Sequence, residues 1–272
     1  MHSNTWAMKK LFQLILFVLL AGLASHAVAQ RKQVLLDSYF NNEHKKDDAG
    51  RSISYHYKWN EVDNDGFSIF KEAFKNAGAS GVTQLYRAPD PAVLASADVY
   101  IIVDPDTKKE SPNPKYISQD NVETIRSWVK QGGVLLLLAN DSANVELKHF
   151  NTLAERFGIH FNDDLRNHVK DDAHFKDGAL MVDEGNPVLV SAKKIFMKDI
   201  CSLTLSFPAE PILKDGNAVI IGVCHYGAGT VLAVGDPWVY NEYTNGRLPK
   251  GFDNDKAVND LAHWLIQQIP EE

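Results

Sequence analysis

The sequence has few cysteines, no excess of positive charge and no second long apolar run. Only 2 of its 272 residues are cysteine, which excludes a small domain held together by a disulfide framework. Lysine and arginine total 28 against 35 aspartates and glutamates, so the formal net charge of −7 argues against a broad nucleic-acid-binding surface. Hydrophobic residues make up 44% and charged residues 23%, which is the composition of a globular protein.

The N-terminal segment has the features of a secretory signal peptide. Two lysines precede an apolar run at 11–23, and a small-x-small cleavage sequence ends at Ala29. The run is short for a membrane span and no other follows it, so we expect no stable membrane anchor. We predict a signal peptide over 1–29, one mature domain over 30–272, and a periplasmic or secreted location.

Export would place the two cysteines, Cys201 and Cys224, in an oxidising compartment. Both lie in apolar, strand-like runs, where either a disulfide bridge or two buried free thiols are compatible with the sequence. Neither lies in a glycine-flanked turn, so neither is expected to act as a nucleophile.

Strands and helices alternate along the first half of the mature chain. Short apolar runs predict strands at 34–36, 82–86, 99–103 and 134–138. Helical spacing of apolar residues predicts helices near 65–77, 118–131 and 145–157, the second with Ser118 as its N-cap. This alternation predicts an α/β fold with a mainly parallel sheet that is covered by helices on both faces.

The second half of the chain is richer in predicted strands. Short alternating runs between about 160 and 225 indicate a β-rich insertion or an antiparallel extension of the sheet. A turn at 226–229 predicts a β-hairpin, and an apolar stripe over about 255–268 predicts the last helix.

Polar side chains follow several of the predicted strands. In an open parallel sheet, ligands bind beyond the carboxyl ends of the strands, so we expect these side chains to form one ligand-binding site. Aspartate and asparagine also end strands by making turns, which explains part of the pattern. Aromatic rings beside carboxylates and amides suit a sugar ligand. The expected ligand-binding residues are Asp37, Tyr39, Asn41, Asn42, Glu43, Asp104, Asn140, Asp141, Asp236, Trp238, Asn241 and Glu242.

Paired carboxylates among these residues could instead hydrolyse a glycoside by acid/base catalysis. The candidates are Asp104, Asp141, Asp236 and Glu242. Their separations do not follow from the sequence, so the catalytic pair stays unassigned. The chain contains no G-x-S-x-G, P-loop or G-x-G-x-x-G motif, and no cofactor is expected.

Two acidic segments have partial metal-binding patterns. The segment 61–66 with Glu72 nearly matches a calcium loop, but no entering helix precedes it, and a turn in which Asp65 caps the next helix is the simpler interpretation. His168 and His174, with the aspartates between them, match no common zinc spacing and are interpreted as a solvated acidic loop. We therefore expect no metal site.

Three longer motifs carry a family resemblance. They are the stretches 34–43, 100–106 and 235–242, the last reading Gly-Asp-Pro-Trp-Val-Tyr-Asn-Glu. The chain resembles the class I glutamine amidotransferase-like fold, and is similar to a branch of it that accompanies unsaturated rhamnogalacturonyl hydrolases in polysaccharide-degrading Bacteroidetes. The resemblance implies a flavodoxin-like, mainly parallel sheet and a glycoside hydrolase as a possible partner.

The chain departs from true amidotransferases at the nucleophile. Those enzymes place a cysteine on the turn after the central strand, where this chain has Ala139, Asn140 and Asp141. A carboxamide or carboxylate cannot supply the attacking thiolate, so glutaminase activity is not expected. Three hypotheses remain: an exported accessory protein that binds pectin-like or uronate-containing glycans, a glycan hydrolase that uses paired carboxylates, and a protein-interaction module with a degenerate site.

Overall fold

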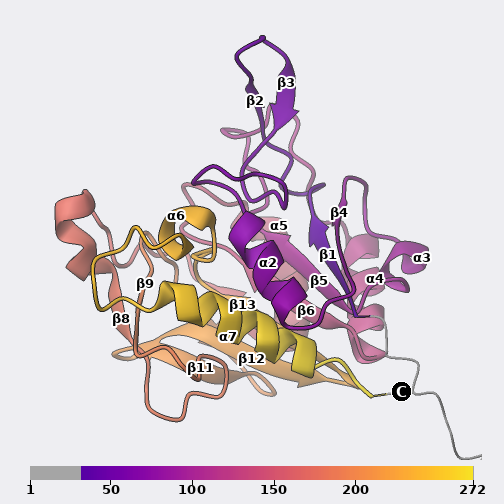
Figure 1. The fold of residues 1–272 in the computed structure, drawn as a ribbon. Helices are drawn as coiled ribbons and strands as arrows, with labels where there is room; N and C mark the ends of the chain where they lie inside the picture. The colour runs from indigo at the N-terminus through magenta and orange to yellow at the C-terminus, as the bar shows by residue number, and fades with distance from the viewer. Residues whose placement is uncertain (1–31, 272) are drawn as a thin grey trace, which may run out of the picture. The chain divides into compact units, whose positions relative to one another are not determined.

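A nine-stranded mixed sheet runs through the centre of the protein (Figure 1). The computed structural model describes residues 32–271, so the predicted signal peptide lies outside the described residues. The strand order is β4-β1-β5-β6-β13-β12-β10-β7, with β11 paired to β12. These strands are β1 (Gln33–Asp37), β4 (Gly81–Leu85), β5 (Val99–Val103), β6 (Val134–Leu138), β7 (Ile159–Phe161), β10 (Leu203–Leu205), β11 (Glu210–Asp215), β12 (Ala218–Tyr226) and β13 (Gly229–Val234).

The sheet has a parallel half and an antiparallel half. Strands β4, β1, β5, β6 and β13 pair in parallel, and β12, β10 and β7 continue the sheet in antiparallel pairs. The mixed α/β fold with a mostly parallel central sheet is therefore confirmed. The β-rich segment near 160–225 supplies the antiparallel half, together with a small separate hairpin of β8 (Ala179–Met181) and β9 (Lys194–Phe196).

Helices cover the two faces of the sheet because side chains alternate along each strand. Val34 and Leu36 of β1 pack in one core with α2 and α7, whereas Leu35 packs in a second core with α3, α4 and α5 (Figure 1). Strand β6, which is buried on both faces at all five residues, reads as a continuous apolar run for this reason. The helices are α2 (Ser68–Asn76), α3 (Pro91–Leu94), α4 (Gln119–Lys130), α5 (Leu147–Ala154), α6 (Asn241–Thr244) and α7 (Asn254–Gln267).

Several element boundaries follow from local signals in the sequence. The Ser118 hydroxyl accepts from the backbone N–H of Asn121, whose side chain bonds back to the Ser118 N–H, so the predicted N-cap of α4 is confirmed as a reciprocal capping box. The predicted hairpin is confirmed as β12–β13. Its turn holds Gly227 at φ 65°, where an added Cβ would lie 2.4 Å from the carbonyl oxygen of Lys130.

Both cysteines lie in the core as free thiols, so the structure contains no bridge between Cys201 and Cys224. Burial raises the pKa of the Cys224 thiol to about 11, which makes it unreactive. Among residues 32–271, no helix combines the length and the apolar character needed to cross a membrane.

Candidate functional site

Four polar side chains lie at the carboxyl ends of four adjacent parallel strands. Asp37 ends β1, Asp104 follows β5, Asn140 lies just after β6 and Asp236 just after β13. Because β1, β5, β6 and β13 are consecutive in the sheet, these side chains come to one edge, which we call the carboxyl edge. The three aspartates are buried, at 0%, 5% and 2% exposure. The edge therefore carries a buried acidic cluster rather than an open row of carboxylates.

Asp104 occupies the centre of this cluster in a strained conformation. Its φ of +40° is in the left-handed region, which non-glycine residues rarely adopt. The Tyr57 hydroxyl donates to Asp104 Oδ2 at 2.9 Å, and the Asn41 amide donates to the Asp104 carbonyl oxygen at 3.0 Å. Burial raises the pKa of Asp104 to about 7, against the lowering effect of the positive charge on nearby His56. The carboxyl group can therefore hold a proton near neutral pH.

Asp236 is the partner of Asp104 in this cluster. Burial raises its pKa well above the ordinary value, and repulsion from Asp104 raises it further. Asp104 Oδ1 and Asp236 Oδ2 are both buried without a hydrogen-bond partner. Two buried carboxyl groups in this state favour the protonated form, which is the form that a general acid needs.

Lys58 supplies a buried positive charge next to the acids of β1 and β5. It is 4% exposed, and its ammonium donates to Asn41 O at 2.8 Å and to Asn41 Oδ1 at 2.7 Å. Burial lowers the pKa of Lys58 to about 8, although Asp37 and Asp106 oppose that shift. Burial also raises the pKa of Asp37 to about 6, although the Tyr100 hydroxyl donates to it at 2.7 Å. Lys58 therefore remains a cation at neutral pH.

His56 and Glu43 form an ion pair at the same edge. His56 Nδ1 lies 2.7 Å from Glu43 Oε1, and the imidazole stacks on the Tyr57 ring with centroids 3.8 Å apart. Burial alone would lower the pKa of His56, but the bond to Glu43 outweighs it and the pKa rises. His56 and Tyr57 have φ values of +65° and +59°, so they share the left-handed conformation of Asp104. Strained residues of this kind concentrate at functional sites.

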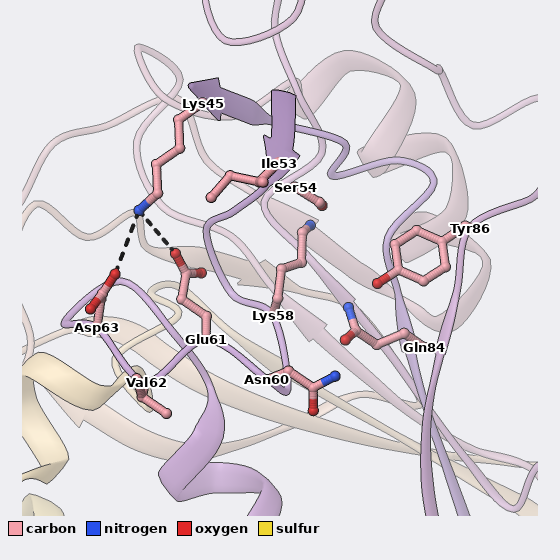
Figure 2. Close-up of a pocket in the computed structure, with 10 residues that line it drawn as sticks. All are labelled: Lys45, Ile53, Ser54, Lys58, Asn60, Glu61, Val62, Asp63, Gln84 and Tyr86. Atoms are coloured by element: carbon pink, nitrogen blue, oxygen red, sulfur yellow. Dashed lines mark hydrogen bonds and ion pairs between the residues drawn. The ribbon is translucent and has the colours of Figure 1, made fainter. Parts of the chain in front are cut away.

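An open pocket is lined in part by Lys58, whose charge also interacts with Asp37 and Asp106 at the carboxyl edge. We call this the Lys58 pocket; it has a volume of about 290 Å³ and is drawn in Figure 2. Its walls come from the hairpin of β2 (His44–Lys46) and β3 (Ser52–Ser54), from the loop 58–63 and from the end of β4. Figure 2 shows Lys58 in the middle of the lining side chains, with Glu61 on one side and Gln84 on the other.

Seven of the ten residues that line the Lys58 pocket are polar or charged, and two of them have unused hydrogen-bonding groups. Lys45 contacts Glu61 at 3.4 Å and Asp63 at 3.8 Å (Figure 2). Glu61 Oε2 and Ser54 Oγ are buried and have no partner. Buried polar atoms are nearly always satisfied in native structures, so these two indicate a bound water or ligand group. The Tyr86 ring is 60% exposed at the pocket mouth, where it can stack on the apolar face of a ligand.

Several expected ligand residues belong to this region. Asn41 and Asn42 hold the edge together, the latter by donating its backbone N–H to Asp106 Oδ2 at 3.0 Å. Glu43 orients His56. The Asn140 amide nitrogen lies 3.4 Å from Asp104 Oδ2. These contacts join the loops after β1, β5 and β6 into one polar network.

The structure corrects the position expected for Trp238. Its side chain is fully buried in the core, at 0% exposure, and offers no ring face to a sugar. Asn241 is also buried, and its amide is used by the chain itself. Its Oδ1 accepts from the N–H of Ile69, while Nδ2 donates to the carbonyl oxygens of Glu61 and Asp63. Asn241 braces the loop before α2, and nothing of its amide remains for a ligand.

Three other expected site residues make contacts outside the network. Asp141 accepts from the N–H of Ala143 at 2.9 Å and so forms a turn. Glu242 pairs with the Arg247 guanidinium, away from the acidic cluster. The Tyr39 ring packs edge-on against Phe40 at a centroid distance of 5.3 Å. None of the three side chains lines the Lys58 pocket, and Tyr39 contacts the cluster only by donating its backbone N–H to Asp37 Oδ1 at 3.1 Å.

The acidic segments considered for metal binding make structural contacts. Asp65 does not cap α2 with its side chain, because the Asn241 amide oxygen does so instead. His168 pairs with Asp199 at 2.7 Å and His174 with Asp171 at 2.6 Å, so the two histidines face different partners. Within residues 32–271, no group of three or more His, Cys, Asp or Glu side chains is placed to hold a metal ion.

Lys58, His56 and Tyr57 are site residues that the sequence analysis missed. They lie in a stretch of charged and aromatic residues without regular periodicity, between the first strand and α2. The aromatic residues on either side of Lys58 were the only local signal, because large aromatic side chains are on average highly buried. The burial of Lys58 depends on the loops after β1 and β5, which no local pattern specifies.

Comparisons with known proteins identify the fold but no family. No protein-family model and no curated relative matches the sequence. Among solved structures, the chain is similar to the mmIFT52 N-terminal domain, with a TM-score of 0.63 and 17% identity over 86% of this chain and 97% of that chain. It is also similar to the Cytoplasmic Protein STM3548 from Salmonella typhimurium, with a TM-score of 0.56 and 15% identity over 88% and 98%.

Two longer enzymes contain a domain of similar fold. One is the β-galactosidase from Rahnella sp. R3, with a TM-score of 0.53 and 14% identity, which matches 89% of this chain but only 32% of the enzyme. The other is the exo-β-1,4-mannosidase Op5Man5 from an Opitutaceae bacterium, with a TM-score of 0.50 and 14% identity, which matches 89% of this chain and 37% of the enzyme. The chain thus spans about a third of each glycosidase.

Proposed function

We propose that this chain is an exported accessory protein of polysaccharide degradation that binds pectin-like or other uronate-containing oligosaccharides in the Lys58 pocket. The observation that carries the proposal is the pocket itself, a polar hollow at the carboxyl edge with a buried ammonium and two unpartnered oxygens. The family resemblance of the motifs at 34–43, 100–106 and 235–242 supports the same context. Export rests on the predicted signal peptide.

The groups in the pocket match the chemistry of an acidic sugar. The Lys58 ammonium can pair with a uronate carboxylate, because its pKa of about 8 keeps it charged at neutral pH. Glu61 Oε2 and Ser54 Oγ can bond to hydroxyl groups, and Tyr86 can stack on a pyranose face. A domain of similar fold within two glycosidases is consistent with a glycoside hydrolase as partner.

Calorimetric titration with digalacturonate and with unsaturated rhamnogalacturonan disaccharide tests this function. We expect binding by the wild type and about tenfold weaker binding by Tyr86→Ala, because the stacking face at the pocket mouth is lost. Tyr116→Ala is the control, since Tyr116 is 38% exposed and does not line the pocket. Equal affinities for the wild type and both variants would show that the sugar does not bind in the Lys58 pocket. If the protein bound no oligosaccharide on a glycan array, a protein-interaction module would be favoured instead.

A glycan hydrolase is the second candidate, and the strained Asp104 favours it. Its pKa of about 7 and its unpartnered Oδ1 suit a general acid. Product analysis on the same unsaturated fragments would detect this activity. Loss of product formation in Asp104→Asn with unchanged binding would establish catalysis at the acidic cluster.

A further inference from the structure

The Lys58 pocket continues into a second hollow on the other side of the loop 60–62. This second hollow, which we call the Lys71 hollow, has a volume of about 420 Å³ and shares Asn60 and Val62 with the Lys58 pocket. Asn60 is exposed and Val62 is 80% exposed, so the two residues form a low ridge between the hollows. Figure 2 shows both residues at the border of the Lys58 pocket.

The Lys71 hollow repeats the chemistry of its neighbour. The Lys71 ammonium donates to Asn60 Oδ1 at 2.8 Å, as Lys58 donates to Asn41 Oδ1 at 2.7 Å. Each hollow therefore has an ammonium held by an asparagine side chain: Lys58 lines only the first hollow, Lys71 lines only the second, and Asn60 lines both. The exposed Val62 side chain between them is an apolar contact of the kind that the face of a sugar ring prefers.

We propose that the ligand is a linear oligouronide that lies across the ridge of Asn60 and Val62 and places one carboxylate at Lys58 and another at Lys71. This proposal rests on the function proposed above and adds the ligand's length and its number of charges. Two hollows joined over a low ridge fit a chain that continues in both directions better than a single terminal sugar. The protein would therefore bind internal segments of a polyuronide.

Titration with galacturonate oligomers of increasing length tests this arrangement. The wild type should bind tetragalacturonate about tenfold more tightly than digalacturonate, because the longer chain extends over both hollows and gains the second ion pair. Lys71→Gln should lose this gain and keep its affinity for digalacturonate. Lys115→Gln is the control, because Lys115 is exposed and lines neither hollow. Thermal unfolding of each variant verifies that it is folded.

The possible outcomes separate the two proposals. Binding of digalacturonate without any gain for longer chains would overturn the extended site and leave the Lys58 pocket intact. An equal loss for all lengths in Lys71→Gln would also overturn it, because Lys71 would then act on the Lys58 pocket itself. No binding at any length would overturn the proposed function and the extended site together. Methyl-esterified tetragalacturonate should bind no better than digalacturonate if the second carboxylate is recognised.

Discussion

Three residues with left-handed backbone conformation, His56, Tyr57 and Asp104, contact one another in sequence. Tyr57 and Asp104 are joined by the bond from the tyrosine hydroxyl to Asp104 Oδ2, and His56 stacks on the Tyr57 ring. Conformations of this kind cost about 1–3 kcal/mol each, so the surrounding contacts have to stabilise them. Two of the strained residues, His56 and Tyr57, lie on the loop that also carries Lys58, and Asp104 lies on the loop after β5. The strain therefore falls at the carboxyl edge, where the ligand is proposed to bind.

The pKa of Asp104 makes stability depend on pH. Its value of about 7 in the folded state exceeds the ordinary 3.8, so the folded state binds this proton more tightly than the unfolded state does. The stability that this proton binding contributes to the folded state is complete below about pH 4 and is lost as the pH rises to about 7. We expect Asp104→Asn to be more stable than the wild type at pH 8 by an amount on the order of 2 kcal/mol, and similar at pH 4.

Urea unfolding at several pH values measures this difference. Asp48→Asn is the control, because Asp48 is an exposed aspartate outside the cluster, and it should follow the wild type at every pH. A parallel pH dependence in wild type and Asp104→Asn would show that Asp104 does not hold the proton.

At the scale of single residues, the sequence predicts which positions reach the carboxyl edge but not which way they face. Asp37, Asp104 and Asp236 follow apolar runs, so their place was predictable from the strands. Trp238 lies only two residues beyond Asp236, yet its ring turns into the core. The direction of a side chain after a strand depends on what packs over that loop. Here the Trp238 ring packs in the same core as α2 and α7, and no local pattern in the sequence specifies how these helices pack over the loop.

Among the elements, those with strong periodicity or caps were predictable. Strands β5 and β6 and the start of α4 agree with the expectations to the residue, because their signals are local. The β2–β3 hairpin and the short helix α6 were not predicted. Both are brief, and the hairpin lies in a polar stretch that lacks a clear period of two. The Lys58 pocket was missed for this reason, since the hairpin forms one of its walls.

The start of α2 depends on a residue from the far end of the chain. The Asn241 amide contacts Ile69 and Ser68 in the first turn of α2, and the carbonyl oxygens of Glu61 and Asp63 in the loop before it. We expect Asn241→Ala to lower the free energy of unfolding by about 2–3 kcal/mol, because it leaves several buried polar groups unpaired. Denaturant titration measures this loss.

The neighbouring Asn245 provides the matched control for that experiment. Its side chain only accepts from the N–H of Arg247 at an exposed position, so Asn245→Ala should change stability by less than about 0.5 kcal/mol. A similarly small effect of Asn241→Ala would mean that α2 is positioned by its apolar face alone.

At the scale of the whole molecule, the stable core and the proposed binding surface are separate parts. The two large cores lie on the faces of the sheet and contain no residue of 44–54. The proposed site consists of loops and the hairpin at the carboxyl edge. The fold is shared with proteins that are at most 17% identical, which requires only that the apolar pattern is kept. Function can therefore change through the loops while the sheet remains the same.

Removing the hairpin tests this separation. Replacement of 45–53 by two glycines deletes Lys45 and Ile53 from the Lys58 pocket but leaves every residue of the two large cores in place. We expect a cooperative thermal transition within a few degrees of the wild type and loss of digalacturonate binding, because the pocket loses one wall. Calorimetry and circular dichroism on the same preparation measure both results. Retained binding would place the sugar site elsewhere on the carboxyl edge, whereas loss of the cooperative transition would show that the hairpin is part of the folding unit.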